Sequence, residues 1–182
     1  NYLLARENLT DHLEKKDKNN KIRQRLLKIR AKKVILATGA LERPLIFNNN
    51  DRPGIMLSTA VKKYADFFGV KCGEKNVFFT NNDSAYESVL CLFNKGIKVD
   101  AIIDIRNNSN SKIVKTVEQA GIKIYWSHTV VDTNGYKRLN NISIMKLSND
   151  GMTVTGKRIN ISCDCLGVAG GWTPAVHLFT QS

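Results

Sequence analysis

The chain has 182 residues, of which 42% are hydrophobic and 24% charged, a composition typical of globular proteins that argues against intrinsic disorder. Its formal net charge of +12 makes nucleic acid or an acidic protein surface a candidate partner. No apolar run approaches the roughly 18 residues that cross a bilayer, and no secretory signal is visible, so we expect a cytoplasmic protein with no membrane partner. Because the chain opens on Asn1 and not on methionine, we interpret it as a piece of a longer polypeptide.

The basic residues do not form the pattern of a nucleic-acid site. They are dense between Lys15 and Lys33, where they alternate with asparagines and acids and lack neighbouring aromatic side chains. This distribution favours a solvated basic loop and strand. We therefore expect no nucleic-acid partner.

The first elements along the chain are extended. The pattern predicts strands at residues 2–9 and 22–29, separated by a mobile polar hairpin loop at residues 14–20. Residues 34–37 form a continuous apolar run of the kind that is buried on both faces of a parallel sheet. Thr38 and Gly39 follow at its carboxyl end, where the ligand crevice of an open α/β sheet lies. Because Gly39 has no side chain, it would let a cofactor approach the backbone.

A helix is expected next. Pro44 and the turn at residues 51–54 come first, and the hydroxyl of Ser58 can then cap a helix. The helical spacing predicts that this helix turns Val61, Tyr64, Ala65 and Phe68 inward.

Residues 76–106 are predicted to form a βαβ unit. It consists of a strand VFFT, a helix SAYESVLCLFNK, Gly96 as the helix stop and a strand VDAIIDI. Ser84 and Glu87 have the spacing of a capping box, which would fix the start of the helix.

The rest of the chain reads as one further helix followed by strands. The helix is expected at residues 111–120 and the strands near residues 122–126, 128–132, 139–147 and 159–169. Asn149, Asp150 and Gly151 predict a hairpin turn. Parallel units followed by a meander are typical of a nucleotide-binding domain that is inserted into another domain.

The fold class is therefore predicted as α/β. We expect a Rossmann-like two-dinucleotide-domain fold with a parallel βαβ unit, a β-meander and an incomplete first domain. Residues 1–56 would belong to the first dinucleotide-binding domain, residues 57–155 to an inserted NAD(P)-binding-like domain, and residues 156–182 would return to the first domain.

The four cysteines indicate neither a metal site nor a disulfide framework. Cys72, Cys91, Cys163 and Cys165 lack the spacing of metal ligands and form no C-x-x-C pair. Cys163 and Cys165 are two apart on an expected strand, so both should point to one face as reduced core thiols. Without two exchanging thiols, a flavin-linked disulfide reductase is disfavoured.

The turn after the VFFT strand is a degenerate nucleotide-binding turn. A dinucleotide fingerprint needs glycine at three places, which Thr80, Asn82 and Ala85 occupy here. Ala85 is acceptable at the third place, but the Asn82 side chain takes up space that a pyrophosphate needs. We favour a unit retained for structure over a working nucleotide site, and the N–H groups of the helix N-terminus could still bind an anion. Asp104 at the end of the next strand could bind a ribose hydroxyl, although a capping or surface carboxylate is the more ordinary role.

A second candidate site combines the ATG segment with the GGWTP segment. Gly170 and Gly171 permit close backbone approach, and Trp172 supplies a flat apolar wall. The alternative is that Trp172 fills core and the glycines form a turn. We favour cofactor contact, because two small-residue turns at strand ends are expected to lie side by side. The predicted cofactor-binding residues are Thr38, Gly39, Arg43, Pro44, Gly170, Gly171, Trp172, Thr173 and Pro174.

The sequence names no catalytic residue and no metal ligand. His12, His128 and His177 have no carboxylate or cysteine partner at helical spacing. Arg43, next to Glu42, and Arg52 could each contact a phosphate, but surface ion pairs are equally compatible with their positions.

Three quoted segments carry a family resemblance. The run ATGALERPLIFNNNDRPGIML from Ala37, the run FTNNDSAYES from Phe79 and the run GGWTPAVHLF from Gly170 closely resemble the α subunit of heterotetrameric sarcosine oxidase. The pattern ATG-x-x-x-x-P also resembles the motif of the two-dinucleotide-domain flavoproteins. The resemblance covers nearly the whole chain.

The resemblance implies a function. Such complexes oxidatively demethylate sarcosine to glycine with O2, and their α subunit carries NAD while FAD and FMN belong to the assembled complex. Sarcosine and folate would be the small-molecule substrates, and the β, γ and δ subunits the partners. The chain would then be a cofactor-binding and assembly element of an oxidoreductase, with no chemistry of its own.

Two alternatives remain open. One is a subunit of a related flavoprotein dehydrogenase, acting on opines or forming cyanide from glycine, which an iron–sulfur cysteine cluster elsewhere in the full chain would favour. The other is a non-catalytic assembly scaffold that binds no nucleotide.

Overall fold

The structure is a computed structural model that describes residues 2–14 and 21–181. The chain forms two compact units. The smaller unit comprises residues 1–39 and 175–182, and the larger unit comprises residues 40–174. Within the described residues, no helix is long and apolar enough to cross a membrane.

The smaller unit contains a β-hairpin. Strand β1 (Tyr2–Asn8) pairs antiparallel with β2 (Gln24–Arg30), which confirms the two strands expected from the sequence. Most of the predicted loop, at residues 15–20, lies outside the described part of the chain. Near the other end of this unit, residues Phe179–Gln181 form a 3-10 turn.

The strand predicted at residues 34–37 is not formed. Residues 34–37 form no regular secondary structure, and the side chain of Ile35 is 92% exposed. An apolar run becomes a buried strand only when neighbouring strands accept its hydrogen bonds and cover both faces. Among the described residues no strand pairs with this segment, and the nearest strand, β3 (Ala40–Glu42), begins only after Gly39.

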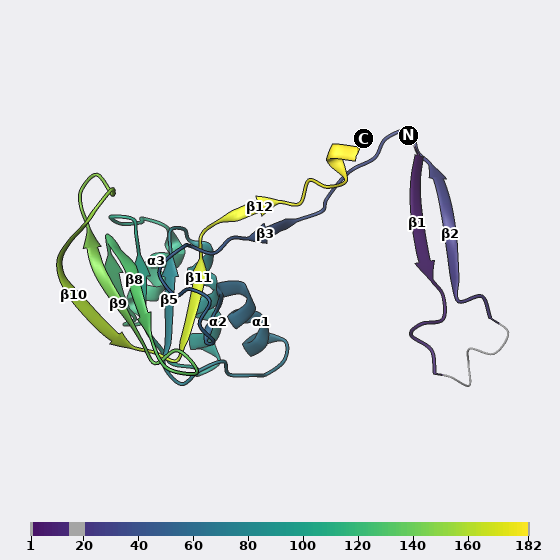
Figure 1. Cartoon of the computed structure of the whole chain (residues 1–182). Helices are drawn as coiled ribbons and strands as arrows, with labels where there is room; N and C mark the ends of the chain where they lie inside the picture. The colour runs from purple at the N-terminus through teal and green to yellow at the C-terminus, as the bar shows by residue number, and fades with distance from the viewer. Residues whose placement is uncertain (1, 15–20, 182) are drawn as a thin grey trace. The chain divides into compact units, whose positions relative to one another are not determined.

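The larger unit is a three-layer α/β structure (Figure 1). Its central sheet is parallel, with strand order β4-β11-β5-β6-β7. The antiparallel sheet β10-β9-β8 lies on the face opposite the helices. The elements are β4 (Ile55–Leu57), α1 (Ser58–Asp66), β5 (Asn76–Thr80), α2 (Ser84–Asn94), β6 (Val99–Asp104), α3 (Lys112–Gln119), β7 (Lys123–Trp126), β8 (His128–Asn134), β9 (Asn141–Leu147), β10 (Val154–Ser162), β11 (Cys165–Ala169) and β12 (Trp172–Pro174).

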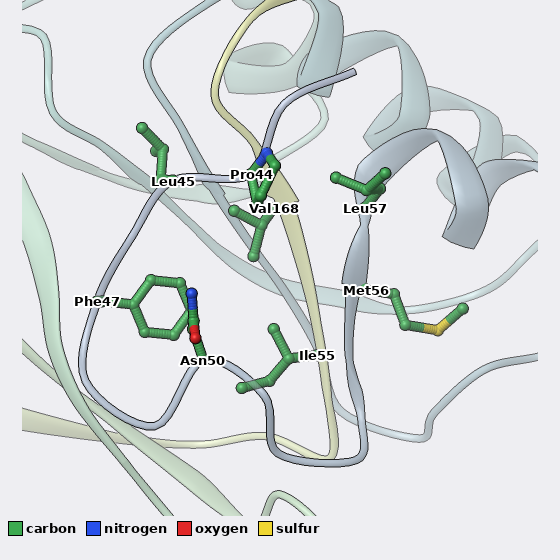
Figure 2. Close-up of a pocket in the computed structure, with 8 residues that line it drawn as sticks. All are labelled: Pro44, Leu45, Phe47, Asn50, Ile55, Met56, Leu57 and Val168. Atoms are coloured by element: carbon green, nitrogen blue, oxygen red, sulfur yellow. The ribbon is translucent and has the colours of Figure 1, made fainter. Parts of the chain in front are cut away.

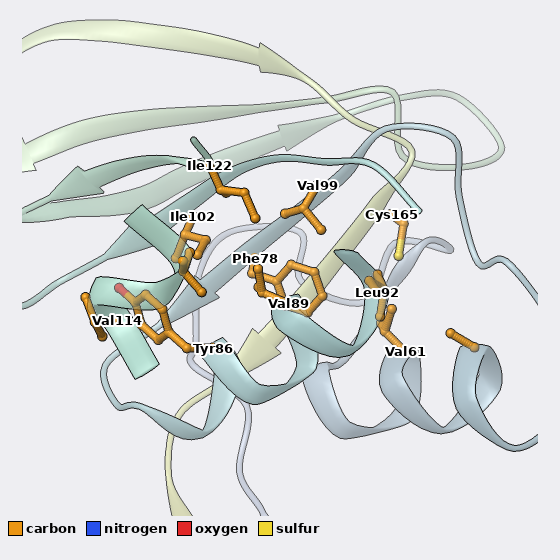
Figure 3. Close-up of a cluster of buried hydrophobic side chains, with 12 residues drawn as sticks. Val61, Phe78, Tyr86, Val89, Leu92, Val99, Ile102, Val114, Ile122 and Cys165 are labelled. Carbon is orange, nitrogen blue, oxygen red and sulfur yellow. The ribbon is translucent and has the colours of Figure 1, made fainter. Parts of the chain in front are cut away.

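Two apolar layers hold this unit together. The layer between the helices and the central sheet includes Phe78, Tyr86 and Val114 (Figure 3). The layer between the central sheet and the antiparallel sheet includes Phe79 and Ile144. Residues of β5 alternate between the two layers, because successive side chains of a strand point to opposite faces. All five residues of β5 are buried.

The structure confirms the predicted βαβ unit and the meander. Strands β5 and β6 flank α2 and pair in parallel, and Gly96 ends the helix with a φ of 72°. Gly151, with a φ of 71°, lies in the turn between β9 and β10. The observed architecture is the Rossmann-like α/β fold that the sequence predicted.

The inward-facing surface of α1 is narrower than predicted. Val61 and Ala65 are buried, but Tyr64 is 43% exposed and Phe68 56% exposed. Helix α1 follows directly on β4, which is the edge strand of the sheet. Among the described residues no strand of this sheet lies beyond β4 to cover the outer side of the helix.

The predicted capping box is absent. The Glu87 carboxylate lies 3.9 Å from Lys62 Nζ, and the α2 N-cap residue, Asp83, makes no side-chain capping bond. The N–H of Ser84 donates instead to the side-chain oxygen of Asn82.

The two neighbouring cysteines do not share a face. Cys163 packs between the two sheets, whereas Cys165 packs under the helices. The turn between β10 and β11 separates them, so the alternation expected within a single strand does not apply. Both thiols are free and buried, in agreement with the prediction of reduced core cysteines.

The unit boundaries differ from the predicted domain boundaries. Residues 40–56 and 156–174 lie in the same compact unit as the βαβ unit. Strands β4 and β11 are part of its central sheet, which accounts for the difference. The assignment of each unit to a particular dinucleotide-binding domain stays a prediction.

Candidate functional site

The carboxyl edge of the central sheet is where this fold would receive a nucleotide. Strands β5 and β11 end side by side there, with Thr80 paired to Ala169. Helix α2 begins four residues after Thr80, so its first N–H groups open on this edge. This turn contains the three predicted fingerprint positions, Thr80, Asn82 and Ala85.

The turn between β5 and α2 is held by its own side chains. The Thr80 hydroxyl accepts a hydrogen bond from Asn82 N–H at 3.0 Å and donates to the Asn82 carbonyl at 2.9 Å. The side-chain oxygen of Asn82 accepts from the Ser84 N–H at 3.0 Å and from its hydroxyl at 2.5 Å. Ala85 is fully buried.

The Asn82 carboxamide also bridges to the neighbouring strand. Its Nδ2 donates to the Ala169 carbonyl at 3.3 Å and to Asn81 Oδ1 at 2.8 Å. The amide therefore spans from the start of α2 to the end of β11, across the path of a pyrophosphate in a working fingerprint. The residues of this turn do not fit a dinucleotide.

Asp104 is buried in an ion-pair network. Its side chain is fully buried and accepts hydrogen bonds from Tyr86 Oη at 2.8 Å and from Arg106 Nη2 at 2.7 Å. Arg106 also donates to Asp83 at 2.7 Å. Asp104 Oδ1 also accepts the Arg106 backbone N–H at 3.0 Å, so this carboxylate is a buried cap for the chain that follows β6 and is not free to bind a ribose.

The network shifts the acid–base properties of its members. Burial, reinforced by the Asp104 charge, raises the pKa of Tyr86 above its ordinary value. The hydrogen bond to Asp104 raises the pKa of Arg106, with a further contribution from Asp83. The tyrosine therefore stays neutral and the arginine stays charged.

The N-terminus of α1 is capped by a distant carboxylate. Glu42 of β3 accepts hydrogen bonds from Ser58 Oγ at 2.7 Å, from Thr59 N–H at 3.0 Å and from Thr59 Oγ1 at 2.5 Å. Ser58, which the sequence predicts as the cap itself, is buried and donates to this carboxylate. The N-cap residue, Leu57, has no side-chain acceptor.

The predicted site residues Thr38 and Gly39 lie in the smaller unit. The Thr38 hydroxyl donates to the Ala175 carbonyl at 2.5 Å, and the Ala175 N–H donates to the Gly39 carbonyl at 3.0 Å. Gly39 has a φ of 73°, and no atom lies within 4 Å of the position of a Cβ there. Its backbone conformation favours glycine, and the space beside it is open.

The remaining predicted site residues lie in the larger unit, in and around a two-stranded ribbon. Strand β12 pairs antiparallel with β3, with Trp172 opposite Glu42, and the ribbon continues through bonds between Arg43 and the two glycines. The residues concerned are Arg43, Pro44, Gly170, Gly171, Trp172, Thr173 and Pro174.

The two glycines of this ribbon have different roles. A Cβ on Gly170 would lie 2.8 Å from the carbonyl oxygens of Arg43 and Pro44, so close packing of the chain on itself already requires glycine there. Gly171 has a φ of 107°, and nothing lies within 4 Å of its Cβ position. Trp172 is 47% exposed, and its Nε1 donates to Ser84 Oγ at 3.2 Å.

A small apolar pocket lies beside Pro44. It has a volume of about 230 Å³, and Figure 2 shows that the segment preceding β4 forms one wall and β4 the other. This volume is below the roughly 300–1,000 Å³ that is typical of small-molecule sites. The lining residues are Pro44, Leu45, Phe47, Asn50, Ile55, Met56, Leu57 and Val168.

The sequence left Arg52 open between a phosphate contact and a surface ion pair, and it gave Glu42 no role. Arg52 Nη1 donates to the Gly135 carbonyl and its Nε donates to Thr133 Oγ1 at 3.3 Å, so this arginine anchors the loop before β4 on β8. Glu42 acts across the fold on a helix that begins at Ser58. No local spacing rule signals such a contact, although its position beside the ATG segment drew attention to its neighbour Arg43.

Two curated relatives match this chain over its full length, and a third matches most of it. The sarcosine oxidase subunit α of Corynebacterium sp. (strain P-1) is 40% identical over 183 residues, and that of Corynebacterium sp. (strain U-96) is 38% identical over 181 residues. Each comparison covers 100% of this chain and 18% of the relative. The subunit α of Rhizobium meliloti (strain 1021) is 37% identical over 85% of this chain and 14% of its own length. No family profile matches the chain.

Solved structures with a similar fold include a thioredoxin reductase and an FAD-dependent oxidoreductase. The T. acidophilum thioredoxin reductase aligns with a TM-score of 0.64 and 18% identity, covering 87% of this chain and 51% of that one. An FAD-dependent pyridine nucleotide-disulphide oxidoreductase from Desulfovibrio vulgaris aligns with a TM-score of 0.57 and 14% identity, covering 86% and 40%. At this identity the likeness supports the fold alone. Over its full length, this chain is similar to one segment, about 18% in extent, of sarcosine oxidase α subunits, as the sequence motifs predicted.

Proposed function

We propose that the chain is a cofactor-binding portion of a sarcosine oxidase α subunit. The complex would oxidatively demethylate sarcosine to glycine with O2, forming formaldehyde or methylene-folate and hydrogen peroxide. The observation that carries this proposal is the 38–40% identity to two such subunits along the entire chain. The chain itself would contribute binding and assembly, and the amine-oxidising chemistry would reside elsewhere in the complex.

The cofactor assigned to this portion is NAD, with FAD and FMN held by other parts of the complex. We assign its contacts to Arg43, Pro44 and residues 170–174, which lie in the larger unit, while Thr38 and Gly39 stay contacts predicted from the sequence motif. The open space beside Gly39 and beside Gly171 supports close approach of a ligand to the backbone at both places. The partners would be the β, γ and δ subunits, with sarcosine and folate as substrates.

Arg43 provides a test of the cofactor assignment. Its backbone holds the ribbon through bonds to Gly170 and Gly171, while its exposed side chain has no hydrogen-bond or ion-pair partner within the described residues. The substitution Arg43→Gln should therefore leave the fold intact. If the guanidinium contacts a phosphate, NAD affinity of the assembled complex should fall roughly 10- to 100-fold, the effect of losing one charge-assisted hydrogen bond.

The measurement is the amount of NAD that is still bound to each complex after purification and dialysis. Arg158→Gln is the matched control, because Arg158 is an exposed arginine on the antiparallel sheet. Full NAD retention by the Arg43 variant would remove Arg43 from the site. NAD absent from the wild-type complex would contradict the cofactor assignment as a whole.

The enzyme class is tested by substrate. The purified complex should consume O2 and form hydrogen peroxide when sarcosine is added, and should be inactive with opines and with glycine as a cyanide source. Activity with an opine and none with sarcosine would replace the proposal with the related dehydrogenase. A complex that contains no bound nucleotide would favour the assembly scaffold, to which the filled β5–α2 turn lends support.

A further inference from the structure

The carboxyl edge of the central sheet carries two helix N-termini that a ligand would normally use. Helix α2 starts after β5, and helix α1 starts after the edge strand β4. The two helices contact each other near this edge, since Ser88 Oγ in the second turn of α2 donates to Ser58 Oγ, at the start of α1, at 3.4 Å. Free N–H groups at such termini attract anions, so the occupant of each terminus decides what this edge can bind.

At α2 the occupant is the Asn82 carboxamide. It accepts both hydrogen bonds that Ser84 offers and reaches the last carbonyl of β11 with its Nδ2. A nucleotide phosphate would have to displace this amide from all of these bonds. The pyrophosphate position of a working fingerprint is therefore filled by the chain itself.

At α1 the occupant is the Glu42 carboxylate. It accepts three hydrogen bonds from Ser58 and Thr59 and supplies the negative charge that a helix N-terminus favours. An incoming phosphate would meet this charge and would have to compete with it for the Thr59 N–H and the two hydroxyls.

Both occupants are tied to the β3–β12 ribbon. Glu42 is on β3 and lies opposite Trp172 of β12, whose indole N–H donates to Ser84 Oγ. The ribbon thus contacts α1 through Glu42 and α2 through Trp172. At its base, Gly170 lies against the Arg43 and Pro44 carbonyls with no space for a Cβ.

We infer that the protein's own side chains occupy both anion-binding positions of this edge, Glu42 at the N-terminus of α1 and Asn82 at the N-terminus of α2. We call the resulting contact between the β3–β12 ribbon and the two helices the joint. In place of a dinucleotide, the βαβ unit at residues 76–106 binds the β3–β12 ribbon. The inference goes beyond the proposed function and does not depend on which reaction the complex catalyses. It concerns Glu42 and the β5–α2 turn, which are not among the NAD contacts proposed above, whereas ribbon residues 170–174 belong to both.

The first test asks, in the assembled complex, whether the β5–α2 turn is occupied by the Asn82 side chain or binds a nucleotide. Asn82→Leu removes the carboxamide at similar side-chain size, and Asn108→Leu is the matched control at an exposed asparagine in a loop. The inference expects the Asn82 variant to keep the wild-type content of bound nucleotide and to melt several degrees lower, because the turn loses its cap. A loss of bound nucleotide specific to the Asn82 variant would overturn it, and so would an unchanged melting temperature.

The second test addresses the joint. Hydrogen exchange is followed in the assembled complex on peptides that cover residues 40–43 and 170–174, for wild type and for Glu42→Ala. We expect exchange in both peptides to accelerate by about tenfold, because the ribbon loses its hold on α1. Glu87→Ala is the control, since this glutamate is exposed on α2 and should leave the ribbon unaffected. Unchanged ribbon exchange in Glu42→Ala would overturn the assignment of Glu42.

These tests fail independently of the proposed function. If the complex binds no NAD at all, the melting and exchange results still decide whether the joint exists. If NAD is lost from the Arg43 variant but kept by the Asn82 variant, the β5–α2 turn is not part of the cofactor site, as inferred.

Discussion

At the scale of single residues, polar side chains at the sheet edge have become internal partners. Asp104 is the clearest case, because an acid at the end of the second strand of a nucleotide-binding unit is where a ribose contact is expected. Here its carboxylate is fully buried between Tyr86 and Arg106. A buried charge persists only when it is paired and hydrogen-bonded, and this network satisfies that condition.

The raised pKa of Tyr86 should affect how the free energy of unfolding changes with pH. Burial and the Asp104 charge raise its pKa in the folded state above the ordinary value of 10.0. Above pH 10 the unfolded chain ionises this tyrosine while the folded protein keeps it protonated, so its contribution to stability is full below pH 10 and is lost as the pH rises. Between pH 9 and pH 11 the wild-type protein should lose about 1.4 kcal/mol more free energy of unfolding than Tyr86→Phe, which cannot ionise there.

Urea denaturation at the two pH values, with both proteins measured in parallel, gives this difference. Other ionising groups affect both proteins equally and cancel. Identical losses in the two proteins would mean that the phenol is not held neutral by its surroundings.

At the scale of elements, the parallel sheet imposes close packing that local patterns do not reveal. Gly167 lies in the centre of β11 between β4 and β5, with Phe78 of β5 opposite it in the register. A Cβ at Gly167 would lie 2.5 Å from the Phe78 ring, and that ring is fully buried. The glycine therefore makes room for the aromatic ring under the helices.

The substitution Gly167→Ala should destabilise the protein by about 1–3 kcal/mol, the usual cost of an extra methyl group in a packed core. The free energy of unfolding from urea titration measures the effect. The double variant Gly167→Ala with Phe78→Leu should lose less free energy of unfolding than the two single variants lose together. The smaller leucine leaves space for the new methyl group. Additive losses would show that the two positions do not compete for the same volume.

At the scale of the whole molecule, the two units differ in how far they can support themselves. Both apolar layers belong to residues 40–174. The smaller unit offers a two-stranded hairpin whose leucines at positions 4 and 26 are 70% and 71% exposed. A hairpin of this kind is marginal by itself in water and needs a covering surface.

We therefore expect a protein that comprises residues 40–174 to fold alone and to unfold cooperatively. A dispersed amide NMR spectrum together with a single urea transition would confirm this. A peptide of residues 1–39 should show the spectrum of an unfolded chain. If residues 40–174 instead bound a hydrophobic dye and gave a collapsed spectrum, the larger unit would depend on the smaller one.

The sequence by itself determined the features that depend on neighbours along the chain. The apolar run at β5, the helical period of α2, Gly96 at the helix end and the turn at Gly151 each rest on a few adjacent residues, and the structure has them where expected. The family resemblance likewise rests on contiguous motifs.

Only the tertiary structure decided which side chains occupy the carboxyl edge of the sheet. The strand order places β11 between β4 and β5, so Ala169 and Trp172 come to lie beside a turn that precedes them by almost half the chain. The contacts of Asn82 and Glu42, the separate faces of Cys163 and Cys165 and the exposure of residues 34–36 all depend on that order or on which strands are available for pairing. Hydrogen bonds and packing between distant segments form only after the layers assemble, and no local pattern encodes them.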